Sequence, residues 1–125
     1  MQVPPPAAFF EPVNWHRTAL HELAHASGHP SRLDRDLSGR FGSRKYAFEE
    51  LIAEIAAAFS CAALGIVPTV RHADYVGVWL DVLREDNRAI VPAASQASRV
   101  ADYLVGFAPN AVGPAQPAAA DRAPA

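Results

Sequence analysis

Two histidines and a glutamate lie close together, at a spacing that could bind and use a metal ion. They are His21, Glu22 and His25 in the segment His-Glu-Leu-Ala-His. On an α-helix, residues four apart lie on one face, so the two imidazoles can share one tetrahedral metal ion. Glu22 lies beside that face and can accept a proton from a metal-bound water, the general-base position of a zinc hydrolase. The alternative is that both histidines are half-buried and hydrogen bonded to backbone or carboxylate groups.

A catalytic zinc site needs a third protein ligand, and a later helical segment offers two candidates. Glu50 and Glu54 are four residues apart and share a stripe with Ala57 and Cys61. On a solvated helix two like charges at this spacing repel by about 0.2–0.5 kcal/mol, whereas a nearby cation makes the pair favourable. One carboxylate could then bind the metal while the other orients a ligating histidine. The spacing alone leaves open which of the two is the ligand.

Other polar residues near these motifs receive weaker assignments. The metzincin pattern His-Glu-x-x-His-x-x-Gly-x-x-His requires a histidine where this chain has Ser31, so we do not expect a metzincin. His29 comes two residues too early for that role, and we interpret it, like Tyr46, as a candidate substrate-binding group. Glu49 lies off the acidic stripe and is interpreted as a solvent-facing charge. Cys61 is interpreted as a small core residue, because no base that would activate its thiol can be named.

A basic segment separates the two motifs. Its charged residues are Arg32, Arg35, Arg40, Arg44 and Lys45 against Asp34 and Asp36. We interpret it as a solvated loop in which arginine and aspartate side chains pair with each other. Contact with phosphates or an acidic peptide is the alternative.

Helical patterns must position these groups. The sequence predicts a first, largely buried helix over 14–27 with Asn14 as N-cap, and further helices over 46–64, 73–85 and 87–107. The apolar face of the second comprises Phe48, Leu51, Ile52, Ile55, Phe59 and Ala62. Pro92 would start or bend the last helix. Strand signals are weak, so we expect a compact, mainly α domain of about four helices.

Length and composition exclude several classes of protein. The chain has 125 residues, 50% hydrophobic, which suits one domain and excludes a multidomain enzyme. A net charge of −2 means that any nucleic-acid contact would be local. One cysteine excludes a disulfide framework and points to a reducing compartment. No stretch resembles a signal peptide or a membrane span, so we expect a cytoplasmic protein without membrane association.

Prolines concentrate towards both ends of the chain. We therefore predict a Pro-rich lead-in over 1–12, a working domain over 13–107 and a disordered Ala/Pro-rich tail over 108–125. In a domain this small, a metal bridging the first two helices would contribute to stability as well as to chemistry.

Longer stretches of the sequence resemble a known family. They are HELAHASGHPSRLDRDLSGRFGS, YAFEELIAEIAAAFSCAALGI, HADYVGVWLDVLREDNRAI and ADYL. Together they look like the zincin-like metallopeptidase domain at the C-terminal end of ArdC-type antirestriction proteins, also described as the polyvalent-protein metallopeptidase of phages and conjugative plasmids. The resemblance runs from about Val3 to Leu104 and implies an α+β zincin-like fold with little strand.

The resemblance also implies roles for individual residues. His21 and His25 become metal ligands, Glu22 the catalytic acid and base, and Glu50 or Glu54 the third ligand. In the similar thermolysin-like enzymes the ligand is the earlier acid of a Glu-x-x-x-Asp pair, which favours Glu50 as ligand and Glu54 as its outer neighbour. Family members usually carry an N-terminal domain that binds single-stranded DNA. Only about twenty residues precede His21 here, so we do not expect this chain to bind DNA directly.

The resulting hypothesis is a gluzincin-like metallopeptidase with one catalytic Zn²⁺. It would hydrolyse a peptide or protein substrate in the context of phage or plasmid antirestriction or host takeover. The alternative is a metal-stabilised antirestriction or DNA-protection module without catalysis, or an inactive fragment.

Overall fold

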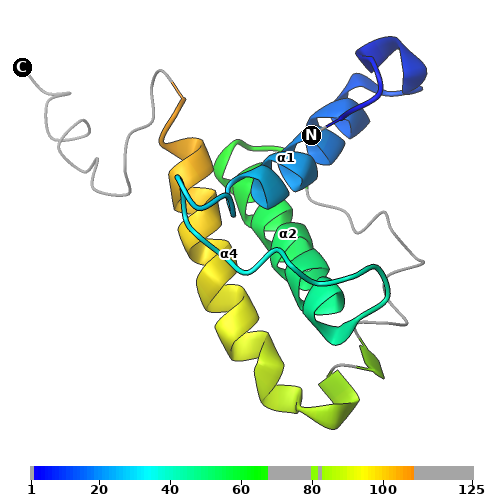
Figure 1. The fold of residues 1–125 in the computed structure, drawn as a ribbon. Helices are drawn as coiled ribbons and strands as arrows, with labels where there is room; N and C mark the ends of the chain where they lie inside the picture. The colour runs from blue at the N-terminus through cyan, green and yellow to red at the C-terminus, as the bar shows by residue number, and fades with distance from the viewer. Residues whose placement is uncertain (1, 68–79, 82, 109–125) are drawn as a thin grey trace, which may run out of the picture.

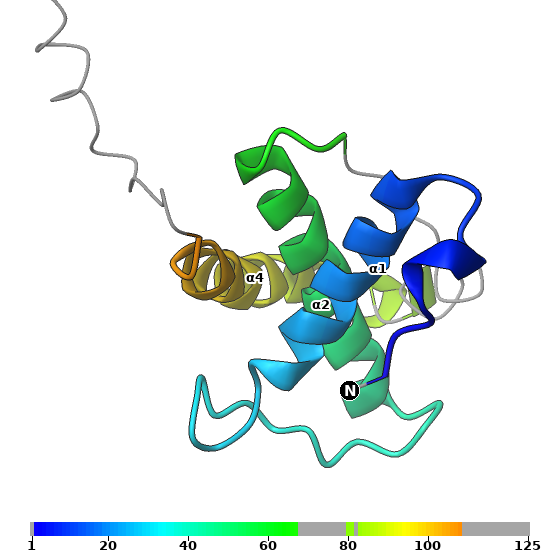
Figure 2. The same ribbon diagram turned by 90° about the horizontal axis from the view of Figure 1, so that it is seen from above.

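The chain folds into helices packed around one central helix. The computed structural model describes residues 2–67, 80–81 and 83–108. Its α-helices there include α1 (Pro12–Ala26), α2 (Arg44–Ala63) and α4 (Ile90–Val105), with 3-10 turns at Pro6–Ala8 and Asn87–Ala89. Helix α2 contacts both α1 and α4, and a long loop leads from α1 to α2 (Figures 1 and 2). The described residues contain no β-strand, so the mainly α prediction is confirmed.

Helix α1 begins two residues earlier than predicted. Pro12 occupies its first turn, where the missing N–H costs nothing, and Asn14 lies inside the helix and accepts a hydrogen bond from Arg17 Nη1 at 2.9 Å. The expectation that α1 is largely buried is wrong, because only His21 and Ala24 are buried along it. In Figure 1 the N-terminal end of α1 extends beyond the other helices, while α1 also packs against α2.

Helix α2 is the core of the domain. Ser43 caps it by accepting a hydrogen bond from the Tyr46 N–H at 3.1 Å, so the helix begins at Arg44, two residues before the predicted start. The predicted apolar face is only partly correct, because Phe59 is 42% exposed and Ala62 is exposed as well. The stripe of Glu50, Glu54, Ala57 and Cys61 is buried instead. Burial raises the pKa of the Cys61 thiol, in line with a core role.

Helix α4 completes the apolar core. Pro92 lies in its first turn, where a proline removes no helical hydrogen bond, so it belongs to the start of the helix. Ala53 and Ala56 of α2 form one buried cluster with Ala93, Ala97 and Val100 of α4, among others. The small side chains let the two helices approach closely.

Two of the segment predictions extend beyond the described part of the chain. Most of the third predicted helix lies outside it, although residues 80, 81 and 83–85 are helical. The predicted tail lies outside it from residue 109 onward. None of the described helices is long and apolar enough to cross a membrane.

Candidate metal centre

The crossing of α1 and α2 brings three potential ligands to one point. His21 and His25 are one turn apart on α1, and Glu50 comes from the second turn of α2. The two Nε2 atoms lie 3.1 Å apart. The Glu50 carboxylate places Oε2 3.2 Å from His21 Nε2 and Oε1 3.0 Å from His25 Nε2. Two imidazoles and a carboxylate that are distant in the sequence therefore converge on one small volume.

This donor set fits a divalent cation. Ligand atoms about 2.0–2.1 Å from a tetrahedral ion lie about 3.3 Å from each other, close to the separations found here. Two imidazole nitrogens and one carboxylate oxygen are also the protein ligands of one class of catalytic zinc site. His21 and Glu50 are only 5% and 4% exposed. Groups so well buried need a charge partner, and a cation between them would supply it.

A further carboxylate contacts each histidine ring at Nδ1, the nitrogen that does not face Glu50. His21 Nδ1 lies 3.1 Å from Glu54 Oε1, and His25 Nδ1 lies 3.2 Å from Glu49 Oε1. A carboxylate at Nδ1 favours the tautomer with its proton there, which leaves Nε2 free to bind a metal. The geometry thus places Glu50 at the centre and Glu54 behind His21.

The interpretation of Glu49 as a solvent-facing charge is wrong. It is 9% exposed and accepts hydrogen bonds from Arg35 Nε at 3.0 Å and Arg35 Nη2 at 2.7 Å. Helix periodicity puts Glu49 beside the acidic stripe, and the face becomes buried because the loop after α1 folds back over it. The sequence did contain an indication of this role. A metal-ligating histidine usually bonds a second group through its other ring nitrogen, and Glu49, next to Glu50, could be that group for one of the two histidines.

The basic loop likewise differs from the solvated segment that we predicted. The side chain of Arg35 is 5% exposed and is bound to the domain rather than to a loop aspartate. Lys45 of α2 and Asp36 of the loop, by contrast, form an exposed pair at 3.0 Å, although the prediction was of pairs between arginine and aspartate.

The charges of the cluster compensate each other. Burial lowers the pKa of both histidines, but the nearby carboxylates outweigh it and raise the pKa of His21 and of His25 to about 9. Burial raises the pKa of Glu50, and its contacts with the two histidines outweigh this effect and lower it to about 2. The pKa of Glu49 is lowered in the same way by His25 and Arg35. A metal cation bound at this cluster would compete with protons for the same imidazole nitrogens.

The remaining candidates are Glu22, His29 and Tyr46. Glu22 follows His21 on α1 and is half-buried. His29 is exposed and bonds within its own loop, with Nδ1 2.8 Å from Ser31 Oγ. The Tyr46 ring packs against Phe41, with ring centroids 5.1 Å apart. His29 and Tyr46 thus each contact a side chain of the loop.

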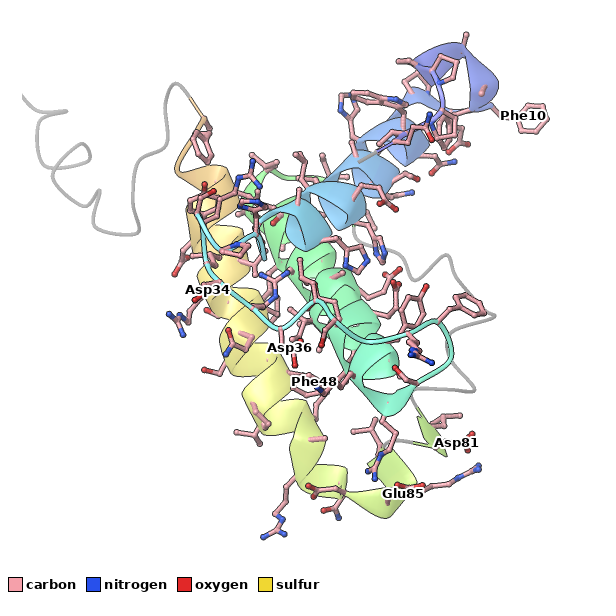
Figure 3. All side chains as sticks on the ribbon, viewed as in Figure 1. Phe10, Asp34, Asp36, Phe48, Asp81 and Glu85 are labelled. Atoms are coloured by element: carbon pink, nitrogen blue, oxygen red, sulfur yellow. The ribbon has the colours of Figure 1, made fainter. Side chains whose placement is uncertain are left out.

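A cavity of about 490 Å³ lies on the other side of Glu49. Its lining includes Leu33, Phe48, Ile52, Asp34, Asp36, Arg35, Glu49, Gln96 and Arg99. Figure 3 shows Asp34, Asp36 and Phe48 where the loop passes α2 and α4. Arg35 and Glu49 thus both line this cavity, and Glu49 also contacts His25.

Known proteins with similar sequences share this domain. A family model described as zincin-like metallopeptidase matches residues 1–96. The uncharacterized protein y4eC of Sinorhizobium fredii is 48% identical over 106 residues, covering 83% of this chain and 34% of that protein. DNA primase TraC of Escherichia coli is 46% identical over 108 residues, covering 86% of this chain and 10% of the primase. The chain thus spans about a third of the length of the first relative and about a tenth of the length of the primase.

Solved structures give the same result in three dimensions. The Mn(II)-bound crystal structure of the antirestriction ArdC protein from plasmid R388 has a TM-score of 0.73 at 45% identity, covering 86% of this chain and 41% of that one. The metal-free structure of ArdC has a TM-score of 0.69 at 47% identity, covering 82% and 37%.

Proposed function

The chain belongs to the zincin-like metallopeptidase family, and from that premise we propose that it is a zinc-dependent peptidase. The family and the Mn(II)-bound relative together indicate a divalent metal. The observation that carries the proposal is the convergence of His21 Nε2, His25 Nε2 and the Glu50 carboxylate at 3.0–3.2 Å. We assign these three residues as the metal ligands and Glu54 as the residue that orients His21. Zn²⁺ is our choice of metal because it prefers such a mixed nitrogen and oxygen donor set.

The proposed reaction divides its tasks between the metal and one glutamate. A zinc ion held by these ligands would polarise the carbonyl of a peptide bond and increase the acidity of a bound water. We assign Glu22 as the general base that takes the proton from the attacking water onto a carboxylate oxygen. The same oxygen would then deliver the proton to the leaving amine. Its place next to His21 on α1 ties this carboxylate to the ligand cluster through a rigid helix.

The substitution Glu22→Gln tests the catalytic assignment. The amide keeps the shape of the side chain but cannot accept a proton, so we expect hydrolysis of a fluorescent casein substrate to fall by about 10²–10⁴-fold. Metal content, measured by elemental analysis, should stay unchanged. Asp102→Asn, an equivalent change on the exposed side of α4, is the matched control and should leave both unchanged. Undiminished hydrolysis in Glu22→Gln would contradict the mechanism.

A second function is favoured by the 45% identity to an antirestriction protein. In this alternative the metal only stabilises a surface that protects incoming DNA, and no bond is cleaved. Protection of unmodified plasmid DNA in a restricting host would then survive Glu22→Gln but fail in His21→Ala. A peptidase that acts in antirestriction would lose protection in both variants.

A further inference from the structure

A buried arginine connects the loop after α1 to the candidate metal centre. Arg35 donates from Nε to Glu49 Oε2 at 3.0 Å and from Nη2 to Glu49 Oε1 at 2.7 Å. The same Glu49 Oε1 lies 3.2 Å from His25 Nδ1. A continuous chain of contacts therefore runs from the loop through Glu49 to the ring of His25.

The guanidinium is held in place by more than its carboxylate. Arg35 Nη2 also donates to the Ala24 carbonyl at 2.7 Å, and Nη1 donates to Ser27 Oγ at 2.9 Å. These two acceptors belong to the C-terminal end of α1, whereas Glu49 belongs to α2. One planar group thus bonds to both elements that carry the histidines and Glu50, and its two-pronged contact fixes the carboxylate in orientation as well as position.

The local backbone makes room for this arrangement. A Cβ added to Gly28 would lie 2.9 Å from Leu37 Cδ2 and 3.0 Å from Arg35 Nη2. The absence of a side chain at this position lets the loop close over the end of α1 with the guanidinium beneath it. A larger residue there would have to displace the arginine or Leu37.

We propose that Arg35 is a positioning residue of the metal centre, which acts through Glu49 to hold the His25 ring with Nε2 facing His21 and Glu50. The inference rests on the proposed metal site but not on peptidase activity. Without the guanidinium, the carboxylate of Glu49 keeps His25 as a partner but loses the bonds that fix its plane. The ring of His25, whose side chain is 25% exposed, is then free to rotate away from the centre. The loop residue Arg35 therefore contributes to metal affinity although it touches no ligand atom.

Zn²⁺ affinity of the full chain, measured by competition with a colorimetric chelator, tests the proposal. We expect Arg35→Gln to weaken Zn²⁺ binding by about 10–100-fold, the usual effect of losing a group that orients a ligand. Arg35→Lys should recover part of the loss, because an ammonium supplies the charge but not the two-pronged contact. The control is Arg32→Gln, since Arg32 also bonds the end of α1, to the Ala26 carbonyl at 2.9 Å, but is exposed rather than buried. It should bind Zn²⁺ like the wild type.

A double-mutant cycle separates positioning from a general effect on folding. If Arg35 acts through Glu49, Arg35→Gln should weaken Zn²⁺ binding little further in a Glu49→Gln background. Additive effects of the two substitutions, or equal affinities of Arg35→Gln and wild type, would overturn the proposal. If Arg35→Gln does not fold, Arg35→Lys tests the proposal instead. Wild-type Zn²⁺ affinity in Arg35→Lys would then overturn the proposal. Failure of the wild type to bind Zn²⁺ would instead contradict the proposed function.

Discussion

Helix α2 takes part in two buried regions of opposite character. Towards α1 and the loop it presents Glu49, Glu50 and Glu54, each 9% exposed or less. The buried apolar cluster that it shares with α4 includes Ile52, Ala53 and Ala56 of α2 and Ala93, Ala97 and Val100 of α4. The first region depends on distances and directions between named atoms, whereas the second depends on filling space.

The two regions also differ in what they contribute. A buried cluster of charges roughly balances its desolvation cost against its attraction, so it is weak evidence for stability. Burial of apolar side chains is the main favourable term in folding. The α2–α4 region therefore supplies most of the stability. The α1–α2 region instead holds carboxylates and imidazoles in the arrangement that a cation needs. Substitutions in the two regions should separate metal affinity from stability.

The largest effect is expected from His21→Ala. The variant loses one proposed ligand and leaves Glu50 and Glu54 buried without its imidazole. Zn²⁺ affinity should fall by more than about 100-fold, since loss of an orienting group alone costs 10–100-fold. Breaking the buried pairs should cost about 3–5 kcal/mol of unfolding free energy in the metal-free protein, measured by urea denaturation. Unchanged Zn²⁺ affinity in His21→Ala would show that the α1–α2 region is not the metal site.

Ile52→Ala should lower the stability of the protein without lowering its Zn²⁺ affinity. Ile52 is 2% exposed within the apolar cluster, and its truncation should cost about 2–5 kcal/mol in urea denaturation. The folded variant should bind Zn²⁺ like the wild type, because no ligand or orienting carboxylate moves. Adding a chelator should accordingly lower the melting temperature of both wild type and Ile52→Ala, but not that of His21→Ala. A chelator shift in His21→Ala would mean that metal binds elsewhere.

Among the substitutions of the polar region, Glu54→Gln is expected to lower Zn²⁺ affinity least. It distinguishes an orienting carboxylate from a ligand. An amide oxygen can still accept from His21 Nδ1, but it lacks the charge that strengthens the bond. We expect Zn²⁺ affinity to fall by about tenfold. Glu85→Gln, at an exposed acid of the chain, is the matched control and should bind Zn²⁺ normally. A loss as large as that of His21→Ala would instead assign Glu54 as a direct ligand.

Helix periodicity explains which parts of the site could be predicted. The sequence predicts that His21 and His25 share a face, with Glu22 beside it, because residues four apart lie on the same side of any helix. The same rule placed Glu50 and Glu54 on one stripe of α2, and the buried stripe agrees with it. The boundaries of α1 were less predictable, because both Pro12 and Asn14 are acceptable near a helix start.

The sequence alone determined the residues that face one another along a single helix, and with them the type of metal site that this chain could build. Only the tertiary structure decided which carboxylate reaches both Nε2 atoms, that Glu49 is buried behind His25, and that Arg35 holds it there. The physical reason is that these contacts join residues from different elements. Their distances depend on how α1 crosses α2 and how the loop folds back, and no local periodicity encodes either.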